Sequence, residues 1–356
     1  MYFHICKHMA YSPGAQLEVT LRAIVCEKPF DLRMDSRTDP PRNPGEVLIR
    51  IRRVGLCGTD YHIYAGMHPY LEYPRVIGHE LAGEVVEAAS LSAFRPGQLV
   101  TVNPYLSCGK CIACRKERQN CCASLRVLGV HTDGGMCDFL AVPEHSVVDA
   151  TGLSFDQAAM VEFLSIGAHA VRRASLRNTD GVLVVGAGPI GIAVALFARF
   201  AGAAVTLMDI SRSRLDYART RLDQQSIVGV SESAKRELSE ITHGEMFDCV
   251  FDATGSITAM RAGLDYVAHG GKYVLVSVVK DELSFPDPEF HKRETTLLAS
   301  RNALREDFEQ VIQHIERGRI ATQALHTHSF PATDAQQRIP ELFAEKASVL
   351  KAIVTF

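Results

Sequence analysis

The pattern of apolar and polar positions changes near residue 150. Before that point, short apolar runs alternate with turns that are dense in Gly and Pro. The segment from Val47 to Arg52 alternates apolar with wetter positions, which is the period-two signal of a strand. The first part of the chain, from about Arg22 to Val148, is therefore predicted to be mostly β with irregular loops.

After residue 150 strands and helices alternate. The predicted elements are a helix at 155–174, a strand at 182–185, a helix at 190–201 and strands at 205–208, 249–251 and 273–278. This order predicts a parallel, doubly wound sheet. Beyond residue 299 the pattern of predicted elements is mixed again, with a helix at 307–317 and a terminal strand at 350–356.

Length and charge narrow the classes of function. A chain of 356 residues favours two domains, and a net charge of −3 argues against a partner that is a nucleic acid or an anionic membrane. No apolar run approaches the roughly 20 residues that span a bilayer. Residues 1–20 precede the first predicted strand and are interpreted as an N-terminal extension. A cytoplasmic protein is expected, because His4, Lys7 and His8 interrupt the apolar core that a secretory signal peptide needs.

A glycine-rich turn indicates a dinucleotide site. Gly186-Ala187-Gly188-Pro189-Ile190-Gly191 follows an apolar strand and opens a helix. In this pattern Gly186 makes the turn, Gly188 admits the pyrophosphate and Gly191 allows close packing. Asp209 ends the next strand and favours NAD over NADP, because a carboxylate repels a 2′-phosphate. Arg212 and Arg214 stand near enough to offset this in part, and an alternative is that Asp209 only caps the next helix.

Ten cysteines include a cluster with metal-ligand spacing. Cys108, Cys111, Cys114 and Cys122 are spaced C-x2-C-x2-C-x7-C, which predicts a closed structural zinc site. Cys121 is an alternative fourth ligand, and an iron–sulfur cluster is the alternative occupant.

A second metal site is predicted from residues far apart in the sequence. Cys57 and His79 are suitable zinc ligands, and a third ligand is either Glu80 or Glu162. Glu162 lies in an apolar helical stretch, where an unpaired carboxylate is costly and a metal relieves the cost. Three protein ligands leave zinc an open position for a substrate.

These motifs together resemble the zinc-dependent medium-chain dehydrogenase family from about Arg22 onward. The resemblance implies a GroES-like β-barrel catalytic domain, 21–150 and 300–356, with a Rossmann domain inserted at 151–299. It implies Cys57, His79 and Glu162 as catalytic zinc ligands, and Glu80 as a carboxylate that binds the zinc transiently. Thr59 and His62 match a proton relay. The family commonly has proline where this chain has Phe163.

A narrower resemblance points to hexonate dehydrogenases, which oxidise sugar acids. It rests on the stretches 129–135, 169–174, 287–296 and 300–303. The implied reaction oxidises a secondary hydroxyl of a hexonate, with L-galactonate the first choice and L-gulonate the second, and passes hydride to NAD. An aldonate carboxylate favours a cationic partner, and His131, Lys292 and Arg301 are the leading candidates.

Several alternatives stay open. Within enzymes the alternative is an L-threonine dehydrogenase or a polyol dehydrogenase of the sorbitol type. The alternatives that are not enzymes are a zinc-free nucleotide-binding protein and a metal-sensing or nucleic-acid-binding module built on the cysteines. The expected partners are a small-molecule substrate and copies of the chain itself, as a homodimer or homotetramer, with two zincs per subunit.

Overall fold

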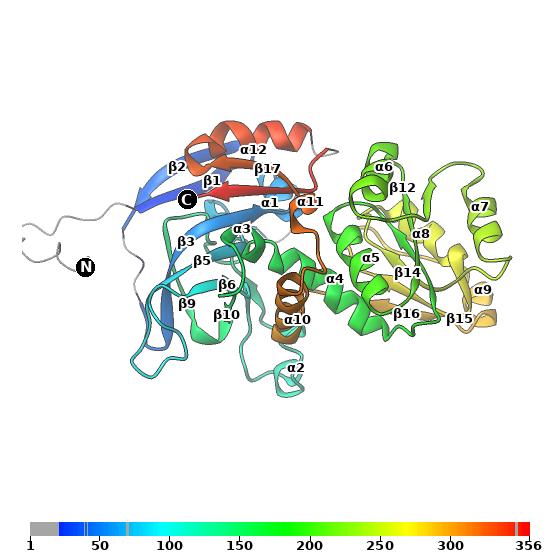
Figure 1. Cartoon of the computed structure of the whole chain (residues 1–356), viewed down its shortest axis with the longest axis horizontal. Helices are drawn as coiled ribbons and strands as arrows, with labels where there is room; N and C mark the ends of the chain where they lie inside the picture. The colour runs from blue at the N-terminus through cyan, green and yellow to red at the C-terminus, as the bar shows by residue number, and fades with distance from the viewer. Residues whose placement is uncertain (1–20, 39, 41, 69–70, 346–347) are drawn as a thin grey trace, which may run out of the picture.

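The computed structural model describes residues 21–38, 40, 42–68, 71–345 and 348–356, arranged in two lobes (Figure 1). One lobe is rich in antiparallel strands and the other holds a parallel sheet between helices. Helix α4 (Val161–Ala174) lies where the lobes meet. The predicted extension at residues 1–20 lies outside the described residues. The boundaries at residues 150 and 300 remain our proposed domain limits.

Strand β3 (Glu46–Leu56) lies at the centre of the antiparallel lobe. Its sheet has the order β10-β6-β5-β3-β18-β17, and β9 also pairs with β3. The partners are β5 (Glu80–Glu87), β6 (Leu99–Val102), β9 (Phe139–Pro143), β10 (Val147–Asp149), β17 (His326–Pro331) and β18 (Lys351–Thr355). Because β18 pairs with β3, the C-terminal segment completes a sheet built in the first half of the chain, as the red and blue strands of Figure 1 show.

Smaller elements complete this lobe. The strands are β1 (Leu21–Lys28), β2 (Asp31–Arg37) and β4 (Arg75–Val76), which form one sheet, and β7 (Tyr105–Leu106) with β8 (Arg126–Val127). The helices are α1 (Gly58–Tyr64), α2 (Ile112–Arg115), α3 (Phe155–Ala158), α11 (Thr322–Leu325) and α12 (Ala335–Ala344). Short 3-10 turns are η1 (Gln119–Cys121), η2 (Glu144–Ser146) and η4 (Ala332–Asp334).

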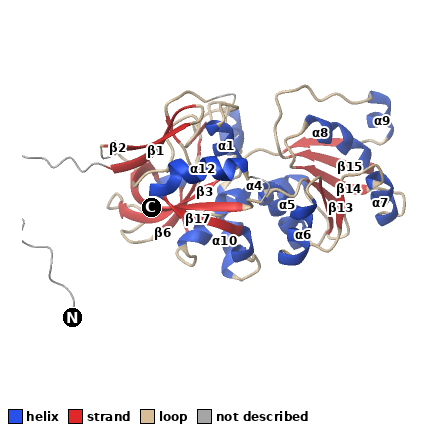
Figure 2. Ribbon diagram, turned by 90° about the horizontal axis from the view of Figure 1, so that it is seen from above, coloured by secondary structure: helices blue, strands red, loops and turns tan. Residues whose placement is uncertain are grey.

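The second lobe contains a six-stranded parallel sheet in the order β13-β12-β11-β14-β15-β16. The strands are β11 (Gly181–Val185), β12 (Ala204–Asp209), β13 (Ile227–Gly229), β14 (Phe247–Asp252), β15 (Val267–Leu275) and β16 (Thr296–Ala299). Alternate residues of β11 enter two different hydrophobic cores, so both faces of the sheet are covered. Figure 2 shows the helices on both sides. The predicted fold class, a β lobe with an inserted doubly wound sheet, is confirmed.

The helices of this lobe follow the strands. They are α5 (Pro189–Phe200), α6 (Arg212–Arg221), α7 (Ala234–Ile241), α8 (Ile257–Gly263) with η3 (Leu264–Tyr266), and α9 (Asp287–Lys292). Helix α10 (Arg305–Glu316) belongs to the segment after residue 300 and packs against α4. The helix predicted at 155–174 is instead two helices, α3 and α4, with a break at Ala159 and Met160. The break places Glu162 in the first turn of α4, where the free amides of the helix terminus favour a carboxylate.

Candidate active site

The four-cysteine lobe (residues 108–122) brings together the cysteines that the spacing predicts. The sulfurs of Cys108, Cys111, Cys114 and Cys122 all lie within 4.8 Å of one another. Cys121 is exposed and is not in this group, so the structure selects Cys122 as the fourth member. Backbone amides lower the pKa of the Cys108 thiol, and they lower that of Cys111 to about 6. Thiolates formed so readily are suitable ligands for zinc.

The second cluster contains Cys57, His79 and Glu80, whose ligand atoms also lie within 4.8 Å of one another. Cys57 is the N-cap of α1, and its sulfur accepts the Thr59 amide hydrogen at 3.5 Å. His79 and Glu80 lie at the start of β5, immediately after Gly78. Two segments that are distant in sequence are thus joined at one buried point.

Asp60 holds these two segments together and was missed by the sequence analysis. Its carboxylate is fully buried and accepts the amide hydrogens of Cys57 at 2.9 Å and of Gly78 at 3.2 Å. The same carboxylate lies 3.8 Å from Nδ1 of His79. The available signal was its place at the third position of α1, where an acidic side chain completes a capping box.

His79 provides the test of whether this cluster fits a metal. Its Nδ1 is buried and has no hydrogen-bond partner among the described residues. Burial opposes the charged imidazole, yet the negative charges of Asp60 and Cys57 raise the pKa of His79 well above its ordinary value. A buried ring nitrogen without a hydrogen-bond partner among the described residues, surrounded by negative charge, is suited to bind a cation. A thiolate and an imidazole are typical zinc ligands.

Glu80 is tied to a residue that the sequence analysis did not consider. Lys351 in β18 places its Nζ 2.6 Å from both carboxylate oxygens of Glu80, and both side chains are buried. The same Nζ donates to the Leu56 carbonyl at 3.2 Å and lies 4.3 Å from the centre of the Phe163 ring. A Cβ on Gly55 would lie 2.1 Å from the Glu80 carboxylate, so glycine is needed there.

Glu162 reaches the same neighbourhood from α4. The Tyr105 hydroxyl donates a hydrogen bond to its Oε1. Burial and the nearby charge of Glu80 raise the pKa of Glu162 to about 7, although His79, Tyr105 and Lys351 oppose the shift. Glu162 is not in the group of atoms within 4.8 Å of one another, so the structure brings Glu80 nearer to Cys57 and His79.

The glycine turn has the geometry that its motif predicts. Gly186 has φ +105°, and a Cβ on Gly191 would lie 1.7 Å from the Gly186 carbonyl oxygen. Gly188 caps α5, and a Cβ there would meet only the guanidinium of Arg214, at 3.9 Å. The first amides of α5 are therefore accessible to a phosphate. Pro189 and Ile190 begin the helix.

Asp209 and Arg214 both lie beside this turn. The Asp209 carboxylate accepts the amide hydrogens of Ala187 and Ser211, each at 2.6 Å. Ser211, not Asp209, is the N-cap of α6. A cavity of about 270 Å³ adjoins the turn, and it is lined by Ala187, Ile192, Ser213, Arg214, Tyr217, Thr327, Ser348, Val349 and Leu350.

Basic side chains lie close to one another and to His79 of the Cys57–His79 cluster. Burial and then the charge of Arg301 lower the pKa of His131, so the two side chains are neighbours. The pKa of His68 is lowered by burial and by His131, His62, His79 and Lys280. We use the term cation group for the cations Lys280 and Arg301 together with the imidazoles of His68 and His131, which are neutral N–H donors when their pKa is lowered. The sequence analysis named only His131 and Arg301 of these four.

Lys292 is the one candidate substrate residue that the structure places elsewhere. It is exposed on α9 and lies 4.0 Å from Glu289. Lys292 precedes β16 whereas Arg301 follows it, so the two lie towards opposite ends of that strand. In Figure 1, α9 is at the outer edge of the second lobe, which holds the parallel sheet.

Comparison with known proteins establishes the family. Residues 43–152 match the alcohol dehydrogenase GroES-like domain, and residues 189–317 match the zinc-binding dehydrogenase model. L-galactonate-5-dehydrogenase of Escherichia coli K12 is 39% identical over 95% of this chain and 99% of its own length. The chain belongs to the zinc-dependent alcohol dehydrogenase family. The prediction of an oxidoreductase with zinc and NAD as cofactors is confirmed at the level of this family.

Other relatives place the dehydrogenase among enzymes of polyols and sugar acids. D-altritol 5-dehydrogenase of Agrobacterium fabrum is 32% identical over 88% of this chain and 90% of its own length. The crystal structure of an alcohol dehydrogenase from E. coli CFT073 with NADH superposes with a TM-score of 0.88. It has 28% identity and covers 94% of this chain and 99% of its own. Across the part of this dehydrogenase that the structure describes, no helix is both long and apolar enough to cross a membrane.

The two relay candidates of the dehydrogenase lie on α1. Thr59 is half-buried beside Cys57, and His62 is exposed in the last turn of the helix. After burial and His131, the charge of His62 also lowers the pKa of His68, so α1 has Cys57 at its N-cap and the cation group near its last turn.

Proposed function

We propose that this dehydrogenase oxidises a secondary hydroxyl of a six-carbon sugar acid, with L-galactonate the first choice and L-gulonate the second. The observation that carries the proposal is the cation group beside the Cys57–His79 cluster. A neutral alditol needs only hydroxyl partners, whereas an aldonate carboxylate favours a guanidinium and N–H donors. The 39% identity to an L-galactonate-5-dehydrogenase supports the same substrate class.

The loop that carries His131 is hydrogen-bonded to Gly78, the residue immediately before His79. The amide of Gly135 donates to the Gly78 carbonyl at 2.9 Å, and a Cβ on Gly134 would lie 2.3 Å from that oxygen. His131 Nδ1 accepts the Val127 amide hydrogen at 3.1 Å, so the neutral ring carries its proton on Nε2. His131 is thereby prepared to donate a hydrogen bond to a substrate oxygen.

The segment beside Arg301 offers further polar groups. Ser300 Oγ and Asn302 Nδ2 are buried and have no hydrogen-bond partner among the described residues. Unpaired buried polar atoms are costly, and a bound polyhydroxy acid would satisfy them. This pattern suits a sugar-chain ligand better than a simple alcohol.

We assign the catalytic zinc to Cys57, His79 and Glu162. Lys351 holds both oxygens of Glu80, whereas Tyr105 holds one oxygen of Glu162, and this difference favours Glu162 as the third ligand. When bound, zinc supplies Lewis-acid chemistry that lowers the pKa of a hydroxyl, and NAD accepts hydride. Within the chain, Thr59 and His62 carry the released proton outward, while Arg301 and His131 orient the carboxylate.

The decisive experiment measures NAD reduction against a panel of hexonates, the matching alditols and L-threonine. We expect L-galactonate or L-gulonate to give the highest kcat/KM. Arg301→Ala is expected to raise the KM for the best hexonate by about 10- to 100-fold, the effect of losing a charge-assisted hydrogen bond. The KM for neutral alcohols should change less than about twofold.

Lys292→Ala is the matched control, because it removes a cation that the structure places on the outer surface of α9. It should leave both substrate classes unaffected. A preference of the unmodified enzyme for an alditol or L-threonine over every hexonate would defeat the proposal and favour the alternative functions. Equal losses on both substrate classes in Arg301→Ala would show that Arg301 supports the fold.

We infer that Asp209 selects NAD over NADP. Asp209→Ala should lower kcat/KM for NAD by about 10-fold or more and improve the relative use of NADP, because the repulsion of a 2′-phosphate disappears. The variant also loses acceptors for the Ala187 and Ser211 amides, so some general loss is expected. The ratio of the two cofactors, measured by steady-state kinetics, separates these effects. An unmodified enzyme that used both cofactors equally would contradict this inference.

The cytoplasmic location and the homodimeric or homotetrameric state stay predictions.

A further inference from the structure

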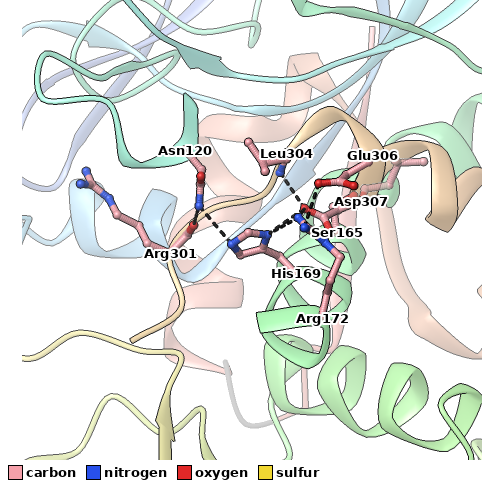
Figure 3. Close-up of polar contacts among 9 residues, drawn as sticks. Asn120, Ser165, His169, Arg172, Arg301, Leu304, Glu306 and Asp307 are labelled. Atoms are coloured by element: carbon pink, nitrogen blue, oxygen red, sulfur yellow. Dashed lines mark hydrogen bonds and ion pairs between the residues drawn. The ribbon is translucent and has the colours of Figure 1, made fainter. Parts of the chain in front are cut away.

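A buried polar network joins the four-cysteine lobe to α4 and to the loop before α10 (Figure 3). Asn120 lies in η1, between the third and fourth cysteines, and is buried. Its side-chain nitrogen lies 2.9 Å from the carbonyl oxygen of Arg301 and 3.0 Å from Nε2 of His169. A residue of the four-cysteine lobe thus contacts the main chain of Arg301, the residue that we propose binds the substrate carboxylate.

The chemistry of these contacts fixes the orientation of Asn120. A carbonyl oxygen only accepts hydrogen bonds, so the amino group of Asn120 must face Arg301. The same amino group donates its other hydrogen to His169, whose Nε2 is therefore an acceptor. His169 then carries its proton on Nδ1 and donates it to Asp307 at 2.8 Å.

Asp307 secures the other end of the loop. Its carboxylate is fully buried and accepts from Arg172 Nε at 2.8 Å and from the Leu304 amide at 2.7 Å. Although burial opposes ionisation, the hydrogen bonds from His169 and Arg172 lower the pKa of Asp307. The loop from Arg301 to Leu304 is therefore held at one end by Asn120 and at the other by Asp307.

The direction of the Arg301 side chain gives this arrangement its significance. Figure 3 shows the guanidinium pointing away from the network, while the carbonyl of the same residue points into it. The effect of Arg301 on His131 places the guanidinium in the cation group. The network holds the main chain, and the side chain remains available to a substrate.

We propose that Asn120 is a positioning residue through which the four-cysteine lobe fixes Arg301 for binding the substrate carboxylate. The inference rests on the proposed function and deepens it. The four-cysteine lobe then has two roles: it stabilises the fold, and it supports selectivity for sugar acids over neutral polyols.

Two variants of the holoenzyme separate hydrogen bonding from packing. Asn120→Ala removes the side chain, and Asn120→Asp keeps its volume but replaces both donated hydrogens with an acceptor that faces the Arg301 carbonyl. Both are expected to raise the KM for the best hexonate by about 10-fold. The kcat, the KM for NAD and the KM for the matching alditol should stay within about twofold. Gln119→Ala, at an exposed position of the same turn, is the matched control and should behave as the unmodified enzyme.

A double variant tests whether Asn120 acts through Arg301. When Arg301→Ala is already present, adding Asn120→Ala should raise the hexonate KM little further, because the two changes disable one function. Independent, multiplying effects would overturn the inference. It would also be overturned if Asn120→Asp matched the unmodified enzyme, or if both substrate classes lost affinity equally.

Hydrogen exchange gives a readout that does not depend on the substrate. Backbone amides of residues 300–308 should exchange faster in Asn120→Ala than in Gln119→Ala, with zinc content unchanged. If the unmodified enzyme prefers an alditol but the exchange result holds, the proposed function fails and the positioning role of Asn120 stands. Unchanged exchange overturns the positioning role whatever the substrate is.

Discussion

Replacing Lys351 with Met is expected to lower the free energy of unfolding by about 3–5 kcal/mol, because one member of a buried ion pair is removed and the other stays. Lys351 and Glu80 are each almost inaccessible to solvent, and Nζ contacts both carboxylate oxygens. Without the ammonium, Glu80 is an unpaired buried carboxylate close to Glu162, whose pKa is raised by burial and then by the charge of Glu80. The Leu56 carbonyl also loses a donor.

Turnover should fall together with stability, since the same carboxylate lies within 4.8 Å of the ligand atoms of Cys57 and His79. A Glu80 released from Lys351 is free to move towards those ligands and to compete with the third ligand for the metal. We expect kcat to fall at least about 10-fold, a loss that corresponds to roughly 1.4 kcal/mol in the barrier.

Urea unfolding of the metal-loaded protein measures the effect on stability. The double variant Lys351→Met with Glu80→Gln should recover much of the loss, because neither buried charge remains. Lys235→Met is the matched control, since Lys235 pairs with Asp265 where both side chains are 58% exposed. Exposed pairs contribute about 0–1 kcal/mol. If Lys351→Met were no more destabilising than Lys235→Met, the buried pair would not be important to the fold.

The signal for Lys351 was present in the sequence but incomplete. A single lysine inside the apolar terminal strand from Leu350 to Phe356 requires a buried partner, by the same argument that singled out Glu162. The partner could not be identified, because Glu80 is 271 positions away and only the pairing of β18 with β3 brings them together. Asn120 and Arg301 are separated in the same way, by 181 positions.

Motifs confined to one local unit can be recognised from the sequence alone. The glycine turn and the four cysteines are fixed by short-range geometry, since φ +105° at Gly186 and the sulfur spacing need no distant partner. The central strand β11 was predictable because it is buried on both faces, so that its residues 182–185 are all apolar.

Element ends were less predictable than element types. The strand predicted at 273–278 is β15, Val267–Leu275, and it extends through Gly270 and Gly271. Val278 is apolar yet 89% exposed, so the apolar run continues past the point where the sheet provides partners. Apolarity indicates that a segment favours burial, but the length of the neighbouring strands decides where pairing stops.

Resemblance to a family also has a physical limit. It grouped Lys292 with Arg301 because both lie in stretches that resemble the hexonate dehydrogenases, yet β16 separates them in space. Conversely, Lys280 joins the cation group without any motif of its own. Which charges face a substrate is set by the ends of strands, and a sequence read without structure does not place those ends.

Serine substitutions at Cys57 and Cys111 are expected to give opposite phenotypes. Cys111→Ser should lower the free energy of unfolding by several kcal/mol (~3–5), because a closed metal site contributes its binding energy to folding. Cys57→Ser should lower kcat by at least about 100-fold, because a metal with an open position supplies several kcal/mol of stabilisation to the reacting charge.

Serine is a demanding test at position 57. Cys57 is also the N-cap of α1, and a serine hydroxyl caps a helix well, so the local fold is preserved while a metal ligand is lost. Stability should then change by less than about 1 kcal/mol. At position 111, which caps α2 without a side-chain hydrogen bond, the change acts mainly through the metal.

Elemental analysis with urea unfolding and steady-state kinetics measures both effects. The unmodified protein should hold two zincs per chain, and each variant should lose about one. Cys121→Ser is the control, since that thiol is exposed and outside the group of four. If Cys57→Ser unfolded the protein and Cys111→Ser only lowered kcat, the assignments of the catalytic and the structural site would have to be exchanged. A content below one zinc in the unmodified protein would contradict the two-site assignment. The buried Nδ1 of His79, which has no partner in the part of the chain that the structure describes, would then need another explanation.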